Sequence, residues 1–229
     1  AAFAALAVAS SPHPPRFDGM FLSLNSQTAL WDTSMWKRDL EAMKTAQLRF
    51  FAVPHLARQI GPATAACPSG TFEAWFPLSS RLPTACFTQV GDTSSSAGTI
   101  GNILAAANAT GLSVHLGLAK ELRMDDQDKS VATLKAFADL QWAVAQQLWQ
   151  VAFTIGLTDV VAGIYTEVEE SNAAPWLAYM KRFASTYLQA LTLNIKKTLR
   201  ADLVVWASPY VLFNRTRFPV QKYLLPSAF

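Results

Sequence analysis

From residue 17 onward, short apolar runs typical of β-strands alternate with longer runs whose apolar residues recur at helical spacing. Strands are expected over 17–24, 48–54, 112–118, 160–168 and 203–210, and helices over 95–110, 131–155 and 174–199. Thr33 or Ser34 is expected to cap a further helix, and 55–93 is expected to be a long loop. Because strands that alternate with helices form parallel βαβ units, the pattern predicts an α/β fold.

About five βα units fit either an open doubly wound sheet or part of an eight-stranded barrel. No strand is followed by GxGxxG or GxxxxGK[ST], so nothing favours nucleotide binding. Residues 211–229 are too few for three more units of about 30 residues each. We therefore expect a (β/α) TIM-type barrel over 17–229 that is incomplete at its C-terminal side.

Residues 1–16 and the cysteines indicate a secretory route. The segment 1–9 is apolar, and Ala7-Val8-Ala9 has the form of a signal-peptidase site, so 1–16 is interpreted as a signal-peptide remnant and linker. An apolar terminus without this role is the alternative. Cys67 and Cys86 are expected to form a disulfide, with free buried thiols as the alternative. Two sequons, at Asn108 and Asn214, are candidate glycosylation sites of a secreted, extracellular protein.

Composition excludes several classes of protein. Hydrophobic residues make up 51% and charged residues 15%, which is unlike a disordered chain. The net charge of +3 is scattered without a basic run, so no nucleic-acid partner is expected. No stretch is apolar over the roughly 20 residues that a membrane span needs.

Alternation along the strands separates two faces. Because side chains of a strand alternate sides, aliphatic residues would meet the helices on one face. The other face would point inward and carry the candidate site, which forms at the carboxyl ends of barrel strands. Its members, with His55 added from the end of the second strand, are Ser23, Asn25, His55, His115, Tyr165, Glu167, Glu169, Ser208 and Tyr210.

Three carboxylates follow one another at the end of the fourth strand. Glu169 is the candidate general acid/base, and Glu167 is a candidate that would raise the pKa of Glu169 through like-charge repulsion. Glu170 has the opposite parity and is expected to face solvent. The alternative is that all three are solvated loop carboxylates.

Aromatic faces stack on the apolar surfaces of sugars, so aromatic residues near this site are candidate platforms. Trp31 and Trp75 are expected in loops, as exposed platforms, while Trp36 has the spacing of a core helix residue. His55 and His115 lack an HExxH or His-x-His arrangement, so no metal or other cofactor is expected. His115 is interpreted as a hydrogen-bonded barrel histidine, and a zinc hydrolase using both histidines is a third hypothesis.

Several short motifs occur together in one order: Gly19-Met20-Phe21-Leu22, Trp36 with Leu40 and Met43-Lys44, 114–118, Gly163-x-Tyr165 with Glu169, and Ser208-Pro209-Tyr210. In this the chain resembles the glycoside-hydrolase-like TIM-barrel family catalogued as domain of unknown function 4434. The resemblance implies a carbohydrate-active barrel and favours Glu169 over Glu167. Ser23 stands where that family often has Gln, and the family's later acidic strands have no counterpart here.

The leading hypothesis is a glycoside hydrolase acting on a polysaccharide or oligosaccharide, with Glu169 as general acid/base. Tyr165, Asn25, His55, His115, Ser208, Tyr210, Trp31 and Trp75 are candidate substrate-binding residues. Glycoside hydrolysis generally needs two carboxylates, and the sequence supplies one cluster. The alternative is therefore a non-catalytic carbohydrate-binding domain, or an inactive truncated barrel.

Overall fold

The computed structural model describes residues 19–120, 130–171 and 184–210, with the backbone alone at 167–171 and 207–210. Its main sheet has five strands that are all parallel and follow one another in chain order. They are β1 (Gly19–Phe21), β2 (Phe50–Val53), β6 (Ser113–Gly117), β8 (Val161–Ser171) and β9 (Val204–Tyr210). The predicted α/β fold is confirmed. The expected barrel is not confirmed as a closed one, because β1 and β9 are the two edges of this sheet and do not pair with each other.

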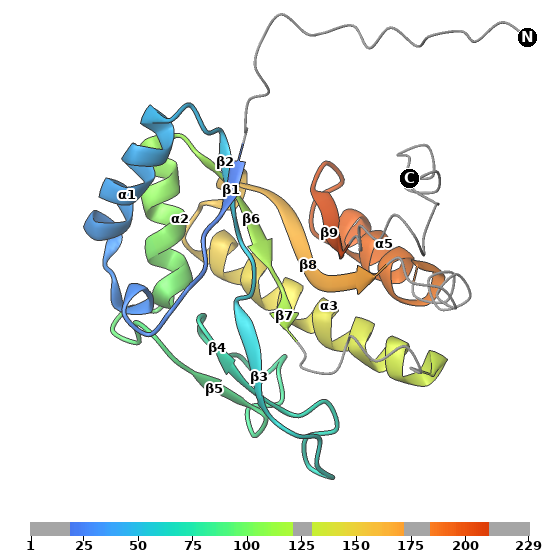
Figure 1. The fold of residues 1–229 in the computed structure, drawn as a ribbon. Helices are drawn as coiled ribbons and strands as arrows, with labels where there is room; N and C mark the ends of the chain where they lie inside the picture. The colour runs from blue at the N-terminus through green and yellow to red at the C-terminus, as the bar shows by residue number, and fades with distance from the viewer. Residues whose placement is uncertain (1–18, 121–129, 172–183, 211–229) are drawn as a thin grey trace, which may run out of the picture.

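Helices follow the strands and wrap the outside of the sheet (Figure 1). They are α1 (Thr33–Thr45), α2 (Gly98–Thr110), α3 (Val131–Thr154) and α5 (Gln189–Thr198), with the short turns η1 (Thr28–Leu30), η2 (Thr158–Val160) and η3 (Ala184–Leu188). The expected cap of α1 was wrong: Asp32 is the N-cap, and its carboxylate accepts from the amide of Met35 at 2.9 Å. That backbone hydrogen bond lowers the pKa of Asp32. Across the described ranges, no helix combines the length and apolarity of a membrane span.

The expectation of a long loop over 55–93 was wrong. A second sheet of order β5-β4-β3-β7 forms there, from β3 (Ala57–Gly61), β4 (Thr71–Ala74), β5 (Phe87–Gln89) and β7 (Ala119–Lys120). These strands have two to five residues and are interrupted by Pro- and Gly-rich turns, so alternation could not reveal them. Because β3 continues from β2 and β7 continues from β6, this sheet lies beyond the carboxyl ends of the main strands (Figure 1).

The predicted disulfide is confirmed: Cys67 and Cys86 are bonded, with Cα atoms 5.5 Å apart. It joins the β3–β4 connection to the residue before β5. The amide of Phe72 in β4 also donates to the carbonyl of Cys86 at 2.8 Å. The disulfide therefore fixes the outer edge of the second sheet.

The predicted alternation is confirmed along β6 and the described part of β8, but not in β1, where Met20 of the expected aliphatic face is 43% exposed. Residues on the helix side of β2, β6 and β8 are fully buried, among them Phe51, Val53, Val114, Leu116 and Ile164. The helices contribute a matching apolar surface, including Trp36 and Leu40 from α1 and Leu148 from α3. The main core thus lies between the sheet and its outer helices.

The main sheet is strongly curled. In a flat sheet, four steps of about 4.8 Å would place β1 and β9 about 19 Å apart, with side chains standing perpendicular to the plane. Phe21 of β1 and Trp206 of β9 nevertheless have ring centroids only 5.6 Å apart. Side chains from opposite edges can meet only across the concave side of a curved sheet, so the strands enclose a trough.

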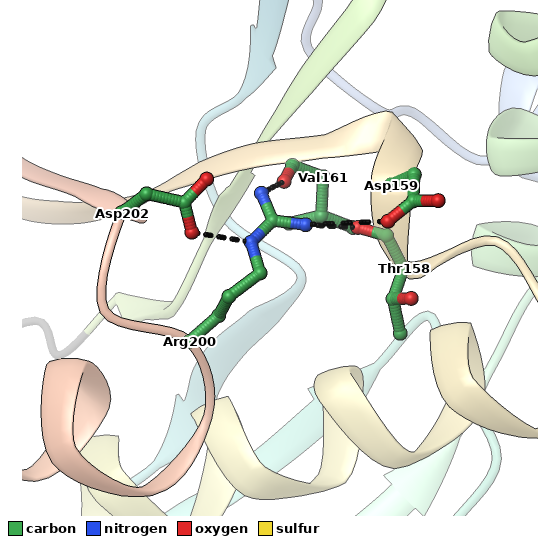
Figure 2. Close-up of polar contacts among 5 residues, drawn as sticks. All are labelled: Thr158, Asp159, Val161, Arg200 and Asp202. Atoms are coloured by element: carbon green, nitrogen blue, oxygen red, sulfur yellow. Dashed lines mark hydrogen bonds and ion pairs between the residues drawn. The ribbon is translucent and has the colours of Figure 1, made fainter.

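Arg200 fastens the amino-terminal ends of β8 and β9 (Figure 2). Its guanidinium donates to the carbonyls of Thr158 at 2.9 Å and Val161 at 2.6 Å, and to the carboxylate of Asp202 at 2.7 Å. Its Cζ also lies 5.6 Å from the ring centre of Trp149. Active sites of parallel α/β sheets form at the opposite end of the strands, so this cluster is structural.

Candidate functional site

The concave side of the sheet is filled by a layer of rings. Phe21, Phe50, His115, Tyr165 and Trp206 contact one another at centroid distances of 4.5–5.6 Å. Each of the five sheet strands contributes one member. The sequence placed Tyr165 and His115 on this face, and the structure brings them together there. The ring layer fills the concave side of the sheet, and none of its five members lines the pocket described below.

His115 is held in one protonation state. Trp206 Nε1 donates to His115 Nδ1 at 2.9 Å, so the imidazole is neutral and carries its proton on Nε2. Burial lowers the pKa of His115. Gly163 makes the room, because a Cβ there would lie 2.4 Å from His115 Nδ1. The interpretation of His115 as a hydrogen-bonded interior histidine is confirmed.

A pocket of about 430 Å³ opens beyond the carboxyl end of β1, between the β1–α1 connection and the second sheet. Its polar lining includes Asn25, Arg58 and Glu73, and its apolar lining includes Leu24, Leu30 and Trp75. Arg58 Nη2 donates to Glu73 Oε2 at 2.9 Å. This strand end is where the sequence placed the site, and a mixed aromatic and polar lining suits a small polar ligand.

Asn25 has a structural role that leaves part of its side chain available. Its Oδ1 accepts from the amides of Gln27 and Thr28, both at 2.9 Å, and so holds the turn that leads into η1. The Nδ2 group of an asparagine supplies two donors that such a turn does not use. Asn25 therefore both shapes the pocket and offers it hydrogen-bond donors.

A hydrogen-bond network from the first turns of α2 holds the opposite wall. Thr99 Oγ1 donates to the carbonyl of Ala29 at 2.7 Å and accepts from the amide of Asp92 at 3.0 Å. Asn102 Nδ2 donates to the Asp92 carboxylate at 2.8 Å. Hydrogen bonds from Ser94 and Asn102 lower the pKa of Asp92, which is therefore ionised. Ala29 and the neighbouring Gly91 both line the pocket.

The two tryptophans predicted as exposed platforms are not exposed. Trp75 is 5% exposed, because Arg58 lies over its ring at 5.7 Å and Gly91 approaches its edge. It lines the pocket nonetheless. Trp31 is half-buried and packs edge-on against Trp36 at 5.0 Å, so it belongs to the margin of the core. His55 is half-buried, with its ring 6.3 Å from that of Trp75.

No protein-family model, curated protein or solved structure matches this chain. The site is therefore interpreted from its own geometry.

The carboxylates predicted for catalysis stay predictions. The side chains of Glu167, Glu169, Ser208 and Tyr210 lie outside the described residues, as does Asn214. The backbone of β8 does continue to Ser171, and its pairing with β9 shifts register between Thr166 and Glu170. Strict alternation from Tyr165 to Glu169, assumed from the sequence, is therefore interrupted in the ladder. Shifts of this kind re-aim side chains and are frequent beside active sites.

Arg58 and Glu73 are the pocket residues that the sequence did not reveal. They are direct cross-strand partners in the β3–β4 ladder. Arg58 lies in the alternating run ARQIG and Glu73 in the alternating run TFEA. Alternation was the one sequence pattern that could have indicated these two strands. That signal was obscured because the whole segment had the composition of a loop.

The described residues also bear on the glycosylation sequon at Asn108 and on the zinc hypothesis. Asn108 is exposed near the C-terminal end of α2, but the threonine of its sequon, Thr110, is buried and donates to the carbonyls of Ala106 and Ala107. Within the described ranges, no three His, Cys, Asp or Glu side chains are placed to hold a metal ion. His115 Nδ1 is also occupied by the Trp206 hydrogen bond, which leaves that atom unable to ligate zinc.

Proposed function

We propose that the chain is a carbohydrate-active domain of glycoside-hydrolase type that binds its glycan at the carboxyl ends of the main strands. The observation that carries the proposal is the strand-end pocket, with Trp75 beside Asn25 and the Arg58–Glu73 pair. Trp75 is 5% exposed and contributes only part of its ring to a lining of apolar groups and hydrogen-bonding groups, and a mixed lining of this kind suits a sugar. The curled sheet of chain-ordered parallel strands supports a barrel of TIM type.

In this proposal Glu169 is the general acid/base that protonates the leaving oxygen of a glycosidic bond. Its place near the end of β8, within the register shift between Thr166 and Glu170, suits a residue aimed at a substrate. Glu167 keeps the pKa of Glu169 raised by charge repulsion. Tyr165 orients Glu169, while Asn25, His55, His115, Ser208 and Tyr210 contact sugar hydroxyls.

The proposal includes secretion of the protein. The disulfide between Cys67 and Cys86 suits an oxidising compartment. The apolar start of the chain and the sequons at Asn108 and Asn214 fit the same route. The motif resemblance to the family of domain of unknown function 4434 agrees with both the barrel and the carbohydrate substrate.

One observation favours a second candidate function, a non-catalytic carbohydrate-binding domain. The carboxylate that lines the pocket, Glu73, is engaged by Arg58 at 2.9 Å. A carboxylate whose oxygen accepts from a guanidinium is held in place as a hydrogen-bond acceptor. Glu73 is therefore suited to binding hydroxyls, and catalysis depends on Glu169 and a second carboxylate.

The test is hydrolysis of an oligosaccharide panel by the purified full chain and two variants. Glu169→Gln should reduce turnover at least about 100-fold, the usual contribution of a general acid/base, without loss of binding. Glu170→Gln on the same strand is the matched control and should keep its activity. Binding without hydrolysis in the unmodified chain establishes the second candidate instead. Unchanged turnover in Glu169→Gln removes this residue from the mechanism.

A further inference from the structure

The charged pair of the pocket is built by strand pairing. Arg58 on β3 and Glu73 on β4 are direct partners in an antiparallel ladder, and their side chains meet at 2.9 Å. Directly opposed residues of such a ladder have neighbouring Cβ atoms, so the sheet itself keeps the two charges together. The Cys67–Cys86 disulfide fixes the far side of the same sheet.

The guanidinium also lies over an aromatic ring. Arg58 Cζ lies 5.7 Å from the ring centre of Trp75, a distance at which a cation is attracted to an aromatic face. Among the described residues, its one hydrogen-bond partner is Glu73. A guanidinium has five N–H donors, and the side chain of Arg58 is 50% exposed, so donors remain for a ligand.

Glu73 provides the complementary acceptor. Its Oε2 accepts from Arg58, its side chain is 29% exposed, and a carboxylate has lone pairs for several further donors. The pair thus offers N–H donors and carboxylate acceptors side by side, with no net charge. Adjacent hydroxyl groups of a sugar match this arrangement, because each hydroxyl can accept one hydrogen bond and donate another.

A charged sugar fits this pair less well. A uronic acid would bring its carboxylate close to Glu73, and an amino sugar would bring its ammonium close to Arg58. Either ligand has to separate two groups that now contact each other at 2.9 Å, or accept like-charge repulsion. A neutral diol meets both groups while leaving the pair intact.

We propose that the Arg58–Glu73 pair selects a neutral sugar unit through two adjacent hydroxyl groups. This inference rests on the proposed function, since it names the sugar class that the strand-end pocket accepts. Discrimination of this kind arises because a wrong ligand leaves a buried or charged group without its partner.

The test is calorimetric titration of the full chain with six oligosaccharide probes. Four are neutral, built from glucose, galactose, mannose or xylose, and two are charged, oligogalacturonate and chitosan oligosaccharide. At least one neutral probe should bind, and both charged probes should bind at least about tenfold more weakly. Arg58→Lys and Glu73→Gln should each raise the Kd of the neutral probe that binds by about tenfold, because each removes about one charge-assisted hydrogen bond.

Matched controls lie on α1, outside the pocket lining. Arg38→Lys and Glu41→Gln make the same chemical changes in exposed ion pairs and should leave every Kd unchanged. Thermal unfolding checks that all four variants are folded. A chain that binds none of the six probes overturns the proposed function together with this inference. Binding that ignores probe charge, or that survives both pocket substitutions, overturns the inference alone.

Discussion

At the scale of single residues, the interior histidine shows how a sheet can bury an ionisable group. His115 accepts from Trp206 at Nδ1, and Gly163 leaves the space its ring occupies. Protonation would remove that acceptor and place a charge beneath aromatic rings. Burial accordingly holds the pKa of His115 below its ordinary value of about 6.5.

This shift predicts acid sensitivity. Because His115 has a lower pKa in the folded chain than in the unfolded chain, the unfolded chain binds more protons as pH falls below about 6.5. The free energy of unfolding should therefore fall as the pH falls below about 6.5 and be fully retained above that pH. Urea unfolding at pH 7.5 and pH 5.5 measures the change. In His115→Gln, the free energy of unfolding should differ less between pH 7.5 and pH 5.5. An equal difference would show that His115 is not the source of the acid sensitivity.

At the scale of elements, the second sheet is the part that strand patterns did not predict and that forms much of the pocket. Its strands are short, and it depends on connections outside the ladder. The side chain of Gln141 on α3 brackets Ala119 of β7, accepting from its amide at 2.9 Å and donating to its carbonyl at 2.6 Å. The disulfide closes the outer side.

Removing the disulfide should therefore loosen this sheet. Cys67→Ala with Cys86→Ala opens a connection whose ends are 19 residues apart in sequence. Loop-closure entropy predicts a loss of about 3 kcal/mol in the free energy of unfolding. Urea unfolding of the double variant and of the unmodified chain gives the difference. The unmodified chain in reducing buffer is the control and should match the double variant. A double variant as stable as the parent would show that the sheet does not need the bond.

At the scale of the whole molecule, strand order and face assignment were predictable, and curvature and the pocket were not. Alternation identified the helix-facing and inward sides because the period of two is encoded in each strand separately. The contact of Phe21 with Trp206 joins the first and last described strands, and no local pattern encodes it. The pairing of Arg58 with Glu73 likewise depends on the register of two strands that looked like loop.

The curled sheet makes its own prediction, because residues on opposite edges of a flat sheet would not interact energetically. Phe21→Ala, Trp206→Ala and the double variant form a cycle whose coupling energy should be about 0.5–1.5 kcal/mol, the usual value for an aromatic pair. Urea unfolding supplies the three differences. Phe153 on α3 is exposed, so a cycle of Phe21→Ala with Phe153→Ala is the matched control and should be additive. Additivity between Phe21 and Trp206 would mean that the two edges do not meet, and that the strands form an open sheet without a trough.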